Sequence, residues 1–186
     1  MTRDRDRDPA GRPRNARPRD GLGRPLGRAG SAEASGSSGA SGTERIPDDL
    51  VIGGTEAAAL ADQLLRDGHP FHAHEVLEAA WKSGPAEERD LWQGLAQIAV
   101  GLTHARRGNA RGAVALLRRG AQRVRAYQDG PGPERAGGPP ASPFGMDVGR
   151  VLAAADDLAA RIERDGLDGI PPADLSPRLL AAKPLA

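Results

Sequence analysis

The chain has 186 residues, with 26 basic and 25 acidic side chains, a formal net charge of +1 and no cysteine. The lack of cysteine excludes disulfides, thiolate catalysis and cysteine-based zinc sites. No apolar run approaches the ~18 residues that a transmembrane helix requires. The N-terminus has arginines but also many aspartates and no apolar stretch, so it matches neither a secretory signal nor an organellar transit peptide. These features predict a cytoplasmic protein that does not enter a membrane.

Composition divides the chain into a packed domain and two tails. Residues 1–45 are rich in Arg, Asp, Gly and Ser and can bury too little apolar surface to offset chain entropy, so we predict a disordered tail. All five aromatic residues lie between 71 and 144, which places the helical domain at 48–166. The proline-containing residues 167–186 are predicted to form an irregular C-terminal tail. A small, alanine-rich core is typical of a marginally stable domain, which favours a homo-oligomer or a protein partner.

Helix start and stop signals predict five helices in this domain. Pro70 suits the first position of the second helix, and Asn109 can cap the fourth. The predicted helices cover about 55–67, 70–82, 86–107, 110–127 and 146–165. No alternation of apolar and polar residues indicates a strand. The predicted fold class is therefore all-α, a compact bundle of four to five helices with the apolar third helix at its centre.

The predicted second helix carries the strongest functional signal. At ~100° per residue, His74, Glu78 and Trp81 fall on one stripe, with Glu75 at its edge. His72 points away from this stripe. Burying a charge is costly unless it is paired or hydrogen-bonded, so the charged groups of an apolar helix need partners. The stripe is therefore either a structural polar network or a site.

Two amides in the third helix are the natural partners of this stripe. Gln93 and Gln97 fall in one narrow sector of an otherwise apolar helix, where buried amides must be hydrogen-bonded. The second and third helices are joined by a short turn, so they should be antiparallel neighbours. Counting back from the turn places Glu78 level with Gln93 and His74 level with Gln97. We therefore expect these four side chains to form one hydrogen-bonded group beneath Trp81.

These motifs, taken in order, resemble the bacterial family known as domain of unknown function 309. The resemblance covers residues 70–128 and is carried by His74, Glu75, Glu78 and Trp81, by the run Gln93 to Gln97, and by His104, Gly108, Asn109, Gly112 and Ala113. It implies a small all-helical fold. It brings no established activity, substrate or cofactor.

The motif His-Glu-x-x-Glu also resembles the His-Glu-x-x-His motif of metalloproteases, in which two metal ligands flank a general base. By that analogy His74 and Glu78 would bind a divalent metal, and Glu75 would be the catalytic base. A zinc site needs a third protein ligand. The strongest candidate, His104, lies ~10 Å along the axis beyond Gln97 and is expected to lie nearer the first helix or His69 than Glu78. No cofactor is established by the sequence. The sequence favours a structural network over a metal site, or over a ligand-binding or acid–base site at the same residues.

Two further patterns have competing interpretations. Small residues of the third and fourth helices, such as Gly101 and Gly112, resemble a tetratricopeptide-type protein-binding hairpin, although the chain has no second copy and ordinary helix packing explains them.

Seven arginines between 91 and 128 could face nucleic acid, a phosphate ligand or an acidic partner. They could equally form a solvated face balanced by Glu87, Glu88, Asp90, Asp156 and Asp157. No aromatic interleaves the arginines, so we predict no nucleic-acid binding.

Overall fold

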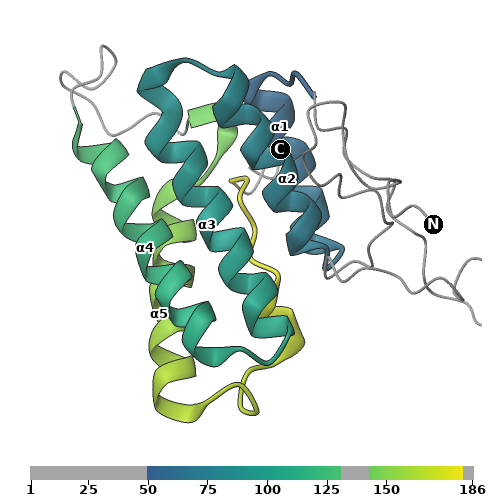
Figure 1. Cartoon of the computed structure of the whole chain (residues 1–186), viewed down its shortest axis with the longest axis vertical. Coiled ribbons are helices and arrows are strands. Elements are labelled where there is room, and N and C mark those ends of the chain that lie inside the picture. Colours follow the sequence, from purple (N-terminus) through teal and green to yellow (C-terminus); the bar gives the residue numbers. More distant parts are fainter. Residues whose placement is uncertain (1–49, 131–142, 182–186) are drawn as a thin grey trace, which may run out of the picture.

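A computed structural model describes residues 50–130 and 143–181. Over this range the chain forms the helices α1 (Gly54–Arg66), α2 (Pro70–Ser83), α3 (Arg89–Arg106), α4 (Ala110–Asp129) and α5 (Val148–Asp165), and the 3-10 turns η2 (Ala86–Glu88), η3 (Pro143–Gly145) and η4 (Pro172–Leu175) (Figure 1). The described residues contain no β-strand, so the predicted all-α class and its five helices are confirmed. The predicted disordered tail, 1–45, lies outside the described residues.

Local sequence signals account for several helix ends. The Asn109 carboxamide oxygen accepts a hydrogen bond of 2.9 Å from the backbone nitrogen of Gly112 and so caps α4, as predicted. Asp147 caps α5 in the same way, accepting a bond of 3.0 Å from the backbone nitrogen of Arg150. After α1 the chain turns at Gly68, whose φ of +80° lies in the left-handed region that glycine adopts without steric cost.

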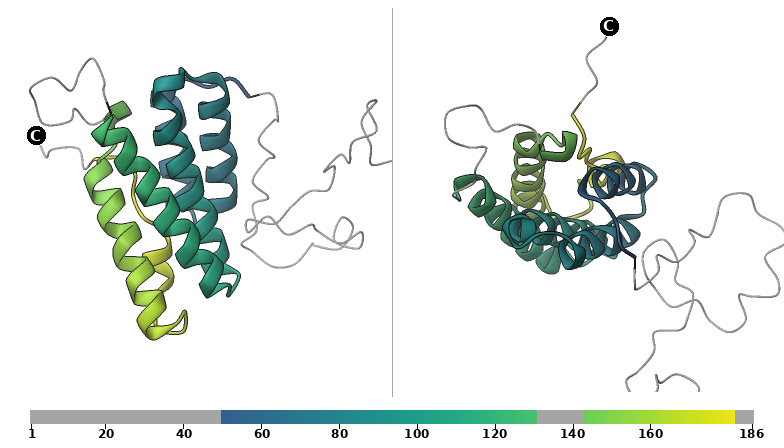
Figure 2. Two further views of the ribbon diagram at one scale, coloured as in Figure 1. Left: turned by 60° about the vertical axis from the view of Figure 1, so that its left-hand side comes forward. Right: turned by 90° about the horizontal axis from the view of Figure 1, so that it is seen from above.

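The helices pack in chain order, and α3 lies in the middle. It contacts α2 on one side and α4 on the other, with the more extensive contact to α4. Figure 2 shows α1 and α2 at one side of the molecule and α5 at the other. Most residues of α3 are buried, which confirms its predicted central position. None of the helices in the described part of the chain is long and apolar enough to cross a lipid bilayer.

The contact between α3 and α4 is close because two glycines face each other. A Cβ atom on Gly120 would lie 2.6 Å from the carbonyl oxygen of Gly94 and 2.9 Å from the backbone nitrogen of Ile98. A Cβ atom on Gly94 would lie 2.5 Å from Cγ2 of Val124. There is no room for a side chain between the two backbones at this crossing. The small residues of these helices therefore have a direct packing role.

The segment after α5 runs back along the bundle between α1 and α5 (Figure 2). Its Ile170, Leu175 and Leu179 are buried against the core. The backbone nitrogen of Leu179 donates a hydrogen bond of 2.7 Å to the buried carboxylate of Asp62 in α1, and its carbonyl accepts one of 2.9 Å from the backbone nitrogen of Asp147. The sequence predicts an irregular C-terminal tail here. In the structure, the residues of this segment up to 181 cover the core between the first and last helices.

Candidate functional site

The predicted polar stripe lines an open groove formed by α2, α3 and α4. The groove has a volume of about 310 Å³. Its lining consists of His74, Glu78, Trp81, Gln93, Ala96, Gln97, Val100 and Arg123. The antiparallel packing of α2 and α3 thus brings five of the predicted cluster residues onto one surface, as expected from counting back along both helices from the turn that joins them.

The carboxylate of Glu78 is held by partners on its own helix. One oxygen lies 2.8 Å from Nζ of Lys82, and the other lies 3.4 Å from Nε2 of His74. Both partners are four residues away, the spacing that places side chains on one helix face. The Glu78 side chain is 36% exposed. It therefore forms a partly solvated ion pair, not the buried charge that the sequence suggested.

The two glutamines do not hydrogen-bond to the α2 residues opposite them. The side-chain oxygen of Gln93 accepts a hydrogen bond from the guanidinium of Arg123. The side-chain oxygen of Gln97 is buried and has no hydrogen-bond partner among the described residues. The predicted network is therefore wrong in its bonds, although its members are neighbours. Glu78 pairs with Lys82 and Gln93 with Arg123, so each of these two side-chain oxygens has a cationic partner in place of the predicted one.

His74 presents a neutral imidazole to this groove. Desolvation of the largely buried ring lowers the pKa of His74 below its ordinary value. The Glu78 carboxylate and the backbone of Phe71 oppose this shift, and the ammonium of Lys82 reinforces it. Because the net shift is downward, the ring is uncharged near pH 7 and can serve as a hydrogen-bonding group.

We expect His74 to titrate below the reference pKa of 6.5. The native state then binds fewer protons than the unfolded chain, so the stability that this group contributes is present above pH 6.5 and is lost as the pH falls through the folded pKa. Glu78→Gln removes the main opposing charge and should lower the pKa of His74 further. NMR titration of the imidazole Cε1–H signal in both proteins measures the shift. A higher pKa for His74 in the Glu78→Gln protein would contradict this account.

The other histidines and Glu75 lie outside the groove. Glu75 is half-buried on α2 but does not line the groove, and His72 is buried with its ring centroid 5.9 Å from that of His69. His104 lies at the end of α3 with Nδ1 2.8 Å from the side-chain nitrogen of Asn109, so it faces the start of α4. No three His, Cys, Asp or Glu side chains within the described ranges could together hold a metal ion. The metalloprotease analogy therefore lacks its third ligand there.

Sequence reasoning missed two cations of the groove and its surroundings. Lys82 follows Glu78 by four residues, and this spacing on one helix is a signal that could have revealed the ion pair. Arg123 is 30 positions from Gln93 and comes from another helix, so no local pattern indicates their contact.

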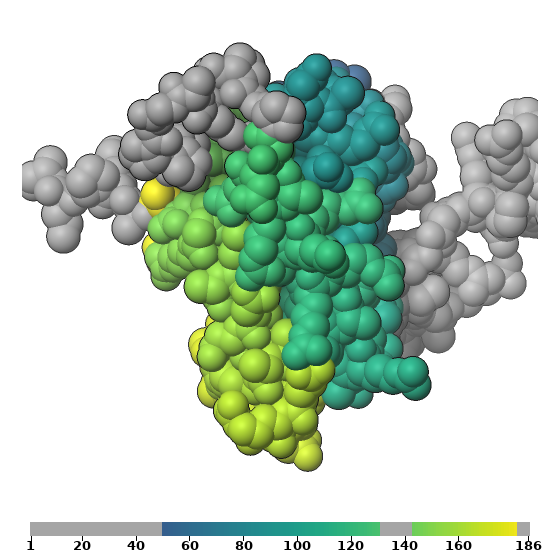
Figure 3. All heavy atoms as spheres, turned by 90° about the vertical axis from the view of Figure 1, so that its left-hand side faces the viewer, coloured from purple at the N-terminus to yellow at the C-terminus, as the bar shows by residue number. Residues whose placement is uncertain are grey.

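The arginine-rich face of α4 is paired in part with acids of the next helix. Arg118 forms an ion pair with Glu163, and Arg125 forms one with Asp156. Figure 3 shows α4 and α5 side by side on this face of the molecule. Asp156 is one of the acids that the sequence predicted to balance this face, whereas Glu163 was not anticipated. The pairs remove part of the positive charge that a nucleic-acid surface would need.

The fold and this groove define a small all-α domain with a polar, tryptophan-containing surface on its second and third helices. Residues 59–116 match the family model described as Domain of unknown function (DUF309), and this match confirms the resemblance seen in the motifs. The chain is also similar to "Uncharacterized protein YpuF" of Bacillus subtilis (strain 168), with 36% identity over 94 residues that make up 50% of this chain and 48% of the relative. The chain thus spans about half the length of the curated relative it matches. No solved structure matches the chain.

Proposed function

We propose that the domain is a protein-interaction module that acts in the cytoplasm, and that the groove formed by α2, α3 and α4 receives an anchor side chain of a protein partner. The observation that carries this proposal is the buried oxygen of Gln97, which has no hydrogen-bond partner in the described part of the chain and lies beside the partly exposed Trp81. Buried polar groups normally have a hydrogen-bond partner, so this oxygen is an acceptor that a bound donor would satisfy. Tryptophan supplies large contact area and is enriched among residues that dominate binding energy.

The groove restricts the chemistry of the anchor. Its volume of about 310 Å³ is at the lower end for ligand pockets and suits one or two side chains. Ala96 and Val100 offer apolar contact, and Gln97 offers an acceptor. The matching anchor has an apolar body and an N–H donor, as tryptophan does. The cytoplasmic location rests on the composition of the chain and not on the groove.

Peptide selection tests this proposal directly. We expect a displayed peptide library to yield binders of the full chain whose affinity falls at least about tenfold in Trp81→Ala and in Gln97→Ala, because both remove groove contacts. Arg111→Ala, at an exposed position of α4, is the matched control and should bind as the parent chain does. Binders that are insensitive to both groove variants would refute the proposal, as would the absence of any binder.

The second candidate function is a metal-dependent or acid–base enzyme that uses His74, Glu75 and Glu78. The His74–Glu78 contact of 3.4 Å favours it, whereas the lysine bound to Glu78 and the position of Glu75 outside the groove count against it. Elemental analysis of the purified chain, followed by thermal shift with divalent metals, separates the two candidates. Stoichiometric metal that is lost in Glu78→Gln would favour the enzyme and contradict a purely binding role.

The Glu78→Gln variant should lose little stability, because the ion pair of Glu78 is partly exposed. Exposed ion pairs contribute up to about 1 kcal/mol, so Glu78→Gln should fold normally and leave the metal measurement interpretable.

Nucleic acid is not the proposed partner, since acids of α5 pair with arginines of α4. A steep salt dependence of DNA or RNA binding would speak against this choice.

A further inference from the structure

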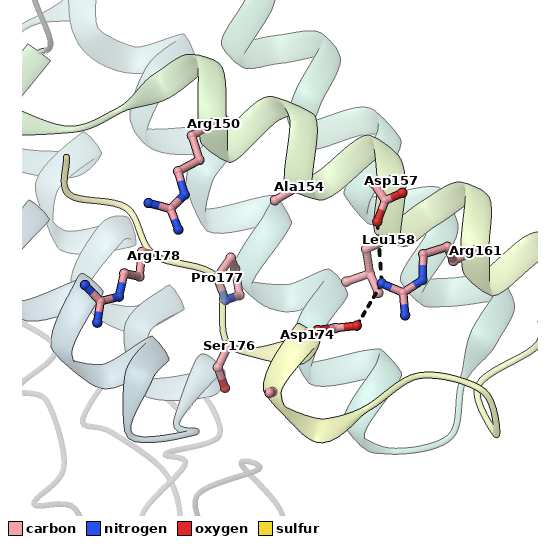
Figure 4. A pocket seen from close by; sticks show the side chains of 10 residues that line it. Arg150, Ala154, Asp157, Leu158, Arg161, Asp174, Ser176, Pro177 and Arg178 are labelled. Atoms are coloured by element: carbon pink, nitrogen blue, oxygen red, sulfur yellow. Dashed lines mark ion pairs between the residues drawn. The ribbon is translucent and has the colours of Figure 1, made fainter. Parts of the chain in front are cut away.

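A second groove lies between α5 and the segment that follows η4, and it shares no lining residue with the first. It has a volume of about 350 Å³. Figure 4 shows α5 along one side of this groove and the segment around Ser176 and Pro177 along the other. The groove is thus formed by residues that the proposed interaction function does not use.

Three arginines line this groove, and their charges are compensated unequally. Arg161 lies 2.7 Å from the carboxylate of Asp174 and 3.5 Å from that of Asp157, so its charge is neutralised within the groove. Arg150 and Arg178 have no acidic partner among the residues that the structure describes. Figure 4 shows the guanidinium groups of Arg150 and Arg178 at one end of the groove and that of Arg161 at the other. Within the described part of the chain, one end therefore carries two positive charges without an acidic partner.

We propose that this groove binds a small soluble molecule carrying a phosphate monoester, with Arg150 and Arg178 holding the phosphate. A phosphate monoester carries about −1.5 to −2 charges near pH 7, which matches the charge of the two guanidinium groups. The planar N–H fork of arginine fits phosphate oxygens through paired, charge-assisted hydrogen bonds. A single carboxylate would need only one of the two arginines.

The middle of the groove can bind the organic group that is attached to the phosphate. Leu158 and Pro177 lie between the free arginines and the Arg161 end, and they offer apolar contact to an organic group attached to the phosphate. Pockets of this size hold small molecules, and their lining typically combines apolar surface with a few polar groups. The ligand class is therefore a phosphorylated molecule with an apolar part, not free inorganic phosphate alone.

The segment that carries Arg178 is held in place from both sides. The hydroxyl of Ser176 accepts a hydrogen bond of 2.8 Å from Arg106 of α3, and the next residue after Arg178, Leu179, is bound to Asp62 of α1. Anchors of this kind reduce the conformational entropy that ligand binding would otherwise cost. The wall of the groove that carries Arg178 is thus preorganised without any ligand.

Calorimetric titration of the full chain with phenyl phosphate tests the proposal. We expect measurable binding that weakens at least about tenfold in Arg150→Gln and in Arg178→Gln, because each variant loses a charge-assisted contact. Arg119→Gln on α4 is the matched control, since it removes an exposed arginine that does not line the groove, and should leave the affinity unchanged. Benzoate, which carries the same ring and one charge, should bind at least about tenfold more weakly than phenyl phosphate.

Several results would overturn the proposal. These are no binding of phenyl phosphate, equal affinity in the two groove variants and the parent chain, or an equal loss in Arg119→Gln. Benzoate binding as tight as that of phenyl phosphate would refute the match to a dianion. Binding to vesicles that contain phosphatidic acid, without binding of phenyl phosphate, would assign the arginines to a lipid headgroup. Because the peptide-binding variants lie in the other groove, this test is independent of the proposed interaction function.

Discussion

Replacing Asp62 with alanine should destabilise the domain by about 2–4 kcal/mol, because it leaves buried hydrogen-bond donors without an acceptor. Asp62 is 5% exposed, and one carboxylate oxygen accepts bonds of 2.7 Å from the backbone nitrogen of Leu179 and 3.2 Å from that of Leu180. The other oxygen lies 3.0 Å from Nε of Arg66. Urea denaturation monitored by circular dichroism measures the loss, and amide exchange should accelerate first at Leu179 and Leu180.

Asp62→Asn is the matched control for this prediction. The amide keeps an oxygen that can accept from Leu179, and it loses the ion pair with Arg66, whose side chain is 47% exposed. Such pairs contribute up to about 1 kcal/mol, so the asparagine variant should be much milder than the alanine variant. If both variants lost the same stability, the charge and not the acceptor would hold the C-terminal segment.

Replacing Gly120 with alanine should cost about 2–3 kcal/mol, although alanine has the higher helix propensity. The added Cβ atom would lie 2.6 Å from the carbonyl oxygen of Gly94, so α3 and α4 would have to move apart. The Cβ atom would also lie 2.8 Å from Cγ1 and 2.9 Å from the backbone nitrogen of Ile98, and the two backbone atoms cannot rotate away as a side chain can. The same denaturation experiment measures the effect.

Gly149→Ala, which makes the same Gly-to-Ala change, is expected to raise the stability of the domain and not to lower it. Gly149 is exposed on α5, and its added Cβ atom would find only a side-chain oxygen of Asp147, at 3.8 Å. Without a clash, the better helix propensity of alanine should stabilise the domain by up to about 1 kcal/mol. A Gly120→Ala protein as stable as the Gly149→Ala protein would show that the two helices can separate at little cost.

Five of the residues that line the candidate site were predictable from the sequence, whereas Arg123 and the bonds within the site were not. Helical periodicity placed His74, Glu78 and Trp81 on one stripe, and the short turn after α2 set the two glutamines level with them. The bonds depend on which cation reaches each oxygen. Arg123 arrives from a third helix, and its position follows from the packing of α4 on α3.

The sequence by itself determined the helices, because the interactions that begin, end and orient a helix act within a few residues. The cap at Asn109, the turn at Gly68 and the apolar circumference of α3 are all local signals of this kind. Only the tertiary structure decided that Asp62 is buried and binds a backbone group 117 positions away. An aspartate in an amphipathic helix has the same local pattern whether it faces water or a distant segment. Its role is set by the returning segment, which is placed by the burial of Ile170, Leu175 and Leu179 against the whole core.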